Sequence, residues 1–179
     1  MRKIIAGFAT SIDGFIEGPN GEIDWIIYDK EQFKDLEKQW QRIDTMFYGS
    51  KTYESVSKAS TGMDQIKQNP FAHMRHYVFS KSLTKVKEEF ILIKGDLKTE
   101  VEKIRNEPGK DIAVFGGAEL LNSLLNLDLV DELVLAICPV LLGKGKPFFP
   151  SIDKRIGWKV NEVKTYRSGL ISISYQRKK

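Results

Sequence analysis

The stretch DIAVFGGAELLNSLL, residues 111–125, places two adjacent glycines where a predicted strand becomes a predicted helix. Its first five residues are typical of a buried strand, and its recurring leucines would share one helical face. Glycine permits a sharp turn with a positive φ, which we expect at Gly117, and lets a ligand approach the backbone. The first N–H groups of a helix favour a phosphate. The pair therefore indicates either a phosphate site or only a tight connection between strand and helix.

A second junction of this kind lies in YGSKTYE, where Gly49 ends a predicted strand. Lys51 and Thr52 follow it and could meet an anion with a charge and a hydroxyl. A third predicted strand, HYVFS, ends in Ser80 and is followed by Lys81. Taken singly, each lysine is more simply interpreted as a solvated surface residue. Together, the three strand ends predict a ligand that carries more than one phosphate.

The composition is that of an ordinary globular protein, and we treat residues 1–179 as a single domain. Apolar residues make up 41% of the chain, which is enough for a full core. The net charge is +4, and the basic residues are scattered except at the very end of the chain. This mild excess suits an anionic small molecule as well as a nucleic acid. The basic face with interleaved aromatic residues that is typical of nucleic-acid binding is missing from the sequence, so we expect no nucleic-acid partner.

The sequence also argues against a disulfide, a metal site and a membrane partner. The single cysteine, Cys138, excludes an internal disulfide and a four-cysteine zinc site. His73 and His76 have no cysteine or clustered carboxylate beside them in the sequence, so a metal site is not expected. No segment approaches the roughly 20 apolar residues that a membrane helix needs. We therefore expect a cytoplasmic protein.

Strands alternate with helices through the middle of the chain, and the last third is entirely strand. We expect strands over residues 3–9, 45–49, 76–80, 90–94 and 111–115, a long strand over 131–143, and two more strands near the end. Helices are predicted after the capping residues Asp29 and Asp96, from about Lys51, and from Ala118. The polar stretch 58–74 is the predicted long loop. This order predicts a three-layer α/β fold, in which helices flank a central mixed β-sheet with an antiparallel edge.

Five stretches, in this order, resemble the motifs of the dihydrofolate reductase-like superfamily, and most closely the reductase domain of riboflavin biosynthesis and its stand-alone relatives. The stretches are SIDGFIEGPNGEIDW (11–25), YGSKTYE (48–54), HYVFSKS (76–82), VFGGAELLNSLL (114–125) and VDELVLAICPVLLGKGKPFFP (130–150). The resemblance covers almost the whole chain. It implies a dihydrofolate reductase-like fold, NADPH as the hydride donor and a homodimer.

The resemblance also implies which residues bind each ligand. It assigns the cofactor pyrophosphate and the nearby nicotinamide side to Gly116, Gly117, Ala118, Glu119 and Leu120. It assigns the phosphates to Gly49, Ser50, Lys51 and Thr52, and the adenosine 2′-phosphate to Ser80 and Lys81. It assigns the substrate to Asp13 and Trp25, with Asp13 as the catalytic residue. It further implies an unusual Gly116–Gly117 linkage, cis or strained.

Asp13 and Trp25 also have simpler interpretations. Asp13 precedes Gly14, so it either holds an N–H of a substrate ring, orients a water, or only stabilises a turn. Trp25 either stacks on a flat ring or lies in the core. One residue departs from the family pattern, since Ser50 stands where the family often has arginine, a bidentate phosphate partner. Lys51, Lys81 and Lys85 are nearby cations that could compensate.

The sequence therefore predicts an NADPH-dependent reductase of a small nitrogen heterocycle. The substrate is expected to be pyrimidine- or pteridine-like, of the 5-amino-6-ribosylaminouracil or dihydrofolate type. The alternative, suggested by Ser50, is an NADP-binding protein without reductase chemistry.

Overall fold

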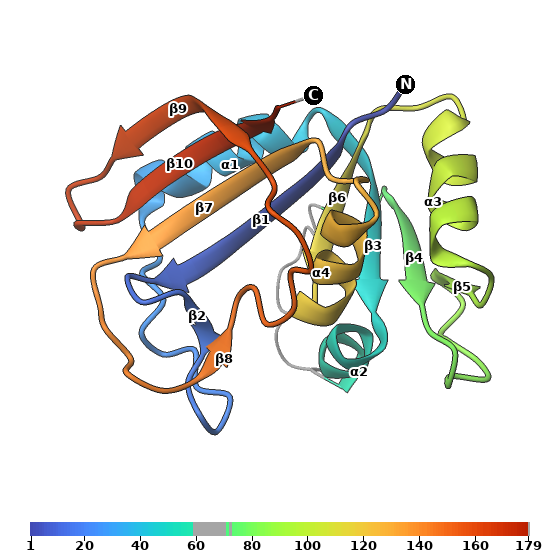
Figure 1. Ribbon diagram of the computed structural model, residues 1–179, viewed down its shortest axis with the longest axis horizontal. Helices are drawn as coiled ribbons and strands as arrows, with labels where there is room; N and C mark the ends of the chain where they lie inside the picture. The colour runs from blue at the N-terminus through green and yellow to red at the C-terminus, as the bar shows by residue number, and fades with distance from the viewer. Residues whose placement is uncertain (59–70, 72, 179) are drawn as a thin grey trace.

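The computed structural model describes residues 1–58, 71 and 73–178, and an eight-stranded sheet forms its centre (Figure 1). In spatial order the strands are β5 (Phe90–Ile93), β4 (Arg75–Phe79), β3 (Ile43–Gly49), β6 (Asp111–Gly116), β1 (Ile4–Ser11), β7 (Glu132–Cys138), β10 (Ile171–Arg177) and β9 (Trp158–Thr165). The strands from β5 to β7 run parallel, and β10 and β9 are antiparallel to their neighbours. The predicted mixed sheet with an antiparallel edge is thus confirmed.

Helices cover both faces of this sheet. α3 (Leu97–Asn106) and α4 (Ala118–Asn126) share one hydrophobic cluster with β1 and β6. α1 (Lys30–Trp40) and α2 (Ser50–Lys58) pack on the opposite face, where Trp40 and Tyr53 join a second cluster. The predicted three-layer α/β fold is confirmed. A two-stranded ribbon of β2 (Phe15–Glu17) and β8 (Lys146–Pro147), which the sequence analysis missed, lies beside the main sheet.

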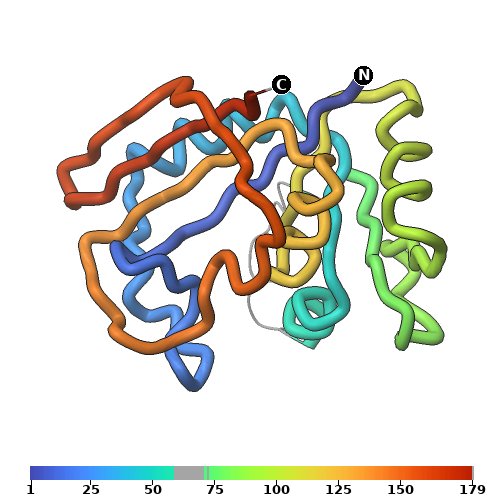
Figure 2. Tube along the Cα trace, viewed as in Figure 1, coloured from blue at the N-terminus to red at the C-terminus, as the bar shows by residue number. Residues whose placement is uncertain are grey.

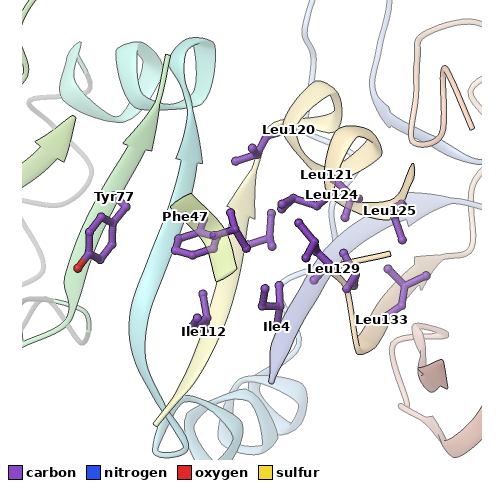
Figure 3. Packing of buried hydrophobic residues seen from close by; sticks show 14 of the residues in the cluster. Ile4, Phe47, Tyr77, Ile112, Leu120, Leu121, Leu124, Leu125, Leu129 and Leu133 are labelled. Carbon is purple, nitrogen blue, oxygen red and sulfur yellow. The ribbon is translucent and has the colours of Figure 1, made fainter. Parts of the chain in front are cut away.

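The leucine face of α4 forms the best-packed part of the core (Figure 3). Leu121 and Leu124 are fully buried and lie over Ile4 of β1 and Ile112 of β6. Burying a leucine side chain contributes about 1.5–3 kcal/mol to stability. The face predicted from the leucine spacing therefore holds α4 against the sheet and places its first turn at the end of β6.

The helix starts follow the predicted capping residues. The carboxylate of Asp29 accepts hydrogen bonds from the N–H groups of Glu31 (2.8 Å) and Gln32 (3.1 Å). Asp96 caps α3 in the same way through the N–H of Thr99, at 3.0 Å. Each cap satisfies a backbone donor that the helix itself leaves unpaired. The predicted loop over 58–74 lies largely outside the described residues.

The long strand predicted over 131–143 is wrong in its second half. β7 ends at Cys138, immediately before Pro139. Proline has no N–H to donate to a strand ladder, and Val140 instead donates to the carbonyl of Cys138 at 2.8 Å. Gly143 then turns the chain with a φ of 71°. The segment after β7 is therefore a loop that passes the carboxyl end of β1.

The strands from β5 to β7 run in one direction, so their carboxyl ends lie at the same edge of the sheet. The two chain termini lie close together (Figure 2). Among the described residues, no helix is long and apolar enough to cross a membrane.

A buried arginine organises the amino ends of the strands. Arg2 is 5% exposed and donates to the carbonyl of Ile104 at 3.2 Å, and to Thr45 and Asp44. Burial acts to raise the pKa of Asp44, but the N–H of Lys110, the Thr45 hydroxyl and Arg2 outweigh it and hold that pKa below its usual value. Asp44 therefore favours the folded state while it is ionised.

We expect Asp44→Asn to destabilise the protein by roughly 3 kcal/mol at neutral pH, because it leaves a buried cation without its counter-ion. A carboxyl whose pKa is lowered by folding stabilises above its unfolded pKa of about 3.9 and stops doing so as pH falls through its folded pKa. Urea unfolding from pH 7 to pH 3 should therefore show the two proteins converging at low pH. Asp24→Asn, at an exposed position, is the control. A difference in unfolding free energy between the wild type and Asp44→Asn that does not change with pH would contradict this account.

Candidate functional site

A cleft of about 500 Å³ lies at the carboxyl ends of β3, β4, β5 and β6, and we call it the anion cleft. The sequence-predicted residues that line it are Gly49, Ser50, Lys51, Thr52, Ser80, Lys81, Gly117, Ala118, Glu119 and Leu120. Gly116 is the one predicted cofactor residue that is not in its wall. The cleft forms here because parallel strands bring their carboxyl ends to one edge of the sheet, where the following helices begin.

The glycine pair allows two elements to approach one another closely. A Cβ at Gly117 would lie 3.0 Å from Oγ1 of Thr52, and one at Gly116 would lie 3.2 Å from the same atom. The positive φ expected at Gly117 is wrong: Gly117 has a φ of −93°, and Gly116 carries the positive value, 142°. The peptide bond between them is cis, which agrees with the resemblance. A side chain at Gly116 would have an unfavourable positive φ, and a side chain at either glycine would crowd the Thr52 hydroxyl of α2.

The N-terminus of α4 is open to a ligand. Its N-cap residue, Gly117, makes no side-chain capping hydrogen bond, so the first N–H groups of the helix have no side-chain acceptor there. An anion in the anion cleft would meet those donors and the positive end of the helix dipole. This geometry favours the phosphate interpretation of the glycine pair over a simple turn.

Lys51 and Glu119 form an ion pair across this opening. Nζ of Lys51 lies 2.7 Å from Oε1 of Glu119, which joins the first turn of α2 to the first turn of α4. The pair lowers the pKa of Glu119 and raises the pKa of Lys51. Both side chains are largely exposed, so the pair is weak. A bound anion would compete with Glu119 for Lys51.

The rest of the anion cleft adds cations that the sequence analysis did not assign. Lys94 follows β5, Lys146 belongs to β8, and both line the cleft with Lys81. Lys146 is already paired with Glu17, at 3.0 Å. Pairing of strands that are distant in sequence brings these lysines together, so no local motif could have identified them. Among the described residues, no group of histidine, cysteine or acidic side chains could hold a metal ion.

Asp13 lies at the end of β1, outside the walls of the anion cleft. Its carboxylate accepts hydrogen bonds from the Ser11 hydroxyl (2.7 Å) and from the N–H groups of Gly143 (2.7 Å) and Leu142 (3.2 Å). The Ser11 hydroxyl is the main reason that the pKa of Asp13 is lowered. Asp13 is therefore ionised at neutral pH and ties the loop after β7 to the end of β1.

A second cavity, of about 280 Å³, lies between α1 and the sheet, and we call it the helix–sheet cavity. Its lining is mainly apolar, with Phe33 and Leu36 from α1 and Phe115 from β6. Trp25 is not in its wall. The Trp25 ring packs on a small cluster that includes Ala136 and Leu170, which do line the cavity, and its Nε1 donates to the carbonyl of Glu22 at 3.0 Å. The three residues after Trp25 do line the cavity.

Small residues beneath α1 create this cavity. Gly7 and Ala9 of β1, Ala113 of β6 and Ala136 of β7 all line it. Their short side chains cannot fill the layer between helix and sheet, and native interiors rarely leave such space empty. Sequence reasoning missed the helix–sheet cavity, although one signal was present. Gln32 in α1 occupies a position that an amphipathic helix normally gives to an apolar residue.

Comparison with known proteins places these features in a family. The sequence model of the RibD C-terminal domain matches residues 2–172 of the chain. A curated Bacillus subtilis (strain 168) protein, YyaP, whose activity is uncharacterized, is 39% identical over 98% of this chain and 95% of its own.

Two solved structures have the same fold. A Shewanella sp. PV-4 protein assigned to riboflavin biosynthesis aligns with a TM-score of 0.83 at 24% identity, over 99% of each chain. A dihydrofolate reductase from Enterococcus faecalis, solved with NADP(H) and RAB-propyl, aligns with a TM-score of 0.69 at 15% identity, over 99% of this chain and 97% of its own. The dihydrofolate reductase-like fold expected from the sequence is confirmed.

Removing the charge of Glu119 should strengthen anion binding in the anion cleft. We expect Glu119→Gln to bind inorganic pyrophosphate about two- to fivefold more tightly than the wild type, because Lys51 is released and a repelling carboxylate is lost. Calorimetric titration at low and high salt measures this, and the gain should shrink with salt. Glu102→Gln, on the exposed side of α3, makes the same change in net charge and should have no effect. Weaker binding by Glu119→Gln would refute the competition between Glu119 and the anion.

Proposed function

Because the chain belongs to the RibD C-terminal domain family, we propose that it is a reductase that transfers a hydride from NADPH to a small nitrogen heterocycle of the pyrimidine or pteridine type. The observation that carries this proposal is the adjacency of the two cavities. Phe115 lines the helix–sheet cavity, and Gly117, two residues later, lines the anion cleft. A dinucleotide extended along the anion cleft would end beside the cavity that holds the second reactant.

The anion cleft fits this cofactor. When bound, NADPH would supply the hydride, and the chain's own residues would hold it in place. The open N-terminus of α4 and Lys51 would bind the pyrophosphate, and Ser80 with Lys81 would meet the 2′-phosphate. The missing side chain at Gly117 leaves room for phosphate oxygens beside Thr52.

The helix–sheet cavity fits the heterocycle. Phe33, Leu36 and Phe115 would enclose a flat ring and exclude water from the face that accepts the hydride. The side-chain amide of Gln32 offers one acceptor and two donors, which match the polar edge of a pyrimidine-like ring. The ionised Asp13, outside this cavity, would act by fixing the nearby loop or by holding a water, because it carries no proton to donate at neutral pH.

Ser50 favours a second candidate function, an NADP-binding protein without reductase chemistry. A serine at this position offers no bidentate contact to a phosphate. The two functions separate on one measurement, which is the fall in NADPH absorbance on adding a panel of pyrimidines and pteridines. Binding of NADPH without oxidation by any member of the panel would favour the second function.

A homodimer, which the family resemblance implies, is also part of this proposal. The outermost strand, β9, exposes Val160 and Val163, which are 51% and 56% accessible. An exposed edge strand with apolar side chains suits pairing with a second copy of the chain.

Gly117→Val should abolish NADPH binding. The new side chain would occupy the space for phosphate oxygens and would contact Thr52, from which even a Cβ is only 3.0 Å away. Fluorescence titration with NADPH measures the effect on a variant first shown to be folded by circular dichroism. Gly157→Val, where a Cβ would meet only the flexible Lys178 side chain, is the matched control and should bind NADPH normally. A folded Gly117→Val protein with unchanged affinity would mean that the glycines serve only the turn.

Asp13→Asn should keep the fold and the NADPH affinity but lower kcat/KM about ten- to a hundredfold, because the loop after β7, or a water held there, would lose a charged hydrogen-bond acceptor. Steady-state kinetics on a turned-over heterocycle measures this. Ser11→Ala removes the 2.7 Å hydrogen bond to Asp13 but keeps the charge, so it should have a smaller effect. Equal losses in the two variants would show that Asp13 only holds the loop, and wild-type turnover in Asp13→Asn would exclude any role in the reaction.

A further inference from the structure

The most buried residue of α1 is a glutamine. Gln32 is 9% exposed, whereas its apolar neighbour Phe33 is 37% exposed. The side-chain amide of Gln32 lines the helix–sheet cavity and makes no hydrogen bond to any residue that the structure describes. Neither polar atom of the amide is fully buried, so the amide is open to a partner from outside the protein. The amide is therefore placed for a ligand, and Gln39, seven residues later, lies on the same stripe of the helix.

The sheet below α1 changes from apolar to polar toward its antiparallel edge. Across the strands, Ala9 of β1 pairs with Ala136 of β7, then comes Ser172 of β10, and then Lys164 of β9. In the next row, Val134 of β7 is followed by Ser174 of β10 and Glu162 of β9. The face of the sheet under α1 is thus apolar beneath the helix–sheet cavity and hydrophilic beside it.

A third cavity, of about 300 Å³, lies over this hydrophilic part, and we call it the polar pocket. Gln39 and Ser172 line both the polar pocket and the helix–sheet cavity, so the two adjoin beneath α1. A ligand whose ring fills the helix–sheet cavity can therefore extend a substituent into the polar pocket. The residues that would receive it include the hydroxyls of Ser172 and Ser174, which make no side-chain hydrogen bond within the described residues.

The charges of the polar pocket are already balanced or negative. Lys164 forms ion pairs with Asp35 and, at 3.6 Å, with Glu31. Lys38 lies 3.8 Å from Asp35. Glu162 lines the pocket and has no ion-pair partner in the described part of the chain. The polar pocket therefore offers no unpaired lysine to an anion, and its spare carboxylate accepts hydrogen bonds from O–H or N–H groups.

We propose that the substrate carries a hydroxyl-rich tail without negative charge, and that this tail occupies the polar pocket. The proposal rests on the proposed function for the ring in the helix–sheet cavity, and it adds the chemistry of the tail. A phosphorylated tail is disfavoured in the polar pocket, because Glu162 would repel it and because it would have to compete with Asp35 for both lysines. Phosphate recognition is confined to the anion cleft at the carboxyl ends of the strands.

Three matched compounds test the tail: uracil, which is the ring alone, uridine, which adds hydroxyls, and uridine 5′-monophosphate, which adds a phosphate. Calorimetric or NMR titration is done with NADP⁺ present, so that the anion cleft is filled, and again without it. Uridine should bind about fivefold or more tightly than uracil, the gain expected from one or two neutral hydrogen bonds. Uridine 5′-monophosphate should bind more weakly than uridine in the presence of NADP⁺.

Two variants test whether the tighter binding of uridine than of uracil arises in the polar pocket. Ser174→Leu fills the polar pocket and should remove the advantage of uridine over uracil while uracil affinity is unchanged. Ile171→Leu, on the opposite face of β10, is its control and should keep the advantage. Glu162→Lys should reverse the preference, so that uridine 5′-monophosphate binds more tightly than uridine. Glu102→Lys makes the same change in net charge on α3 and should leave the preference for uridine unchanged.

The inference is overturned if uridine binds no better than uracil, if its advantage survives in Ser174→Leu, or if the monophosphate binds best to the wild type with NADP⁺ bound. These titrations need no turnover, so their outcome is separate from that of the proposed function. If NADP⁺ binds but uridine binds no better than uracil, the proposed function stands and the hydroxyl-rich tail in the polar pocket is refuted. If uridine binds better than uracil, Ser174→Leu removes that difference, and NADP⁺ does not bind, the tail proposal is supported. NADPH as the cofactor is then refuted.

Discussion

The close approach of α2 and α4 at the end of β6 is the constraint on which the site depends. A Cβ at Gly49 would be 3.4 Å from the N–H nitrogen of Gly117, and a Cβ at Gly117 would be 3.0 Å from Thr52. A side chain at Gly117 would crowd the Thr52 hydroxyl, and Gly116 has a φ of 142°, which other residues rarely adopt. The leucine face of α4 then fixes the arrangement, because Leu121 and Leu124 are buried in the main core.

The two faces of the sheet are used in opposite ways. On the α4 side, large apolar side chains fill the layer, and the helix is held rigidly. On the α1 side, small residues of β1 and β7 leave a cavity, and the residue that α1 buries most is Gln32. A hydrophobic cluster around Tyr48 and Tyr53 on the α1 side also stabilises the fold, and the helix–sheet cavity lies beside it. A layer that is fully packed could not admit a ligand.

Charged side chains have different roles at the two ends of the parallel strands. At the amino ends, Arg2 and its partner Asp44 are held by several hydrogen bonds, which is a structural arrangement. At the carboxyl ends, Lys51, Lys81 and Lys94 line an open cleft at which two helices begin. The first end satisfies its charges within the protein. The second leaves cationic groups and backbone donors for an external anion.

Local chemistry in the sequence was sufficient to predict the strands of the main sheet apart from the end of β7, the capped helices and the Gly116–Gly117 junction, because backbone preferences and the spacing of leucines act over a few residues. It also identified most of the wall of the anion cleft through motifs at strand ends. Only the tertiary structure showed that β7 stops at Cys138, that Lys146 joins the cleft and that Gln32 faces the small residues of distant strands. These features depend on which strands are neighbours, and that order follows from packing between residues far apart in the chain.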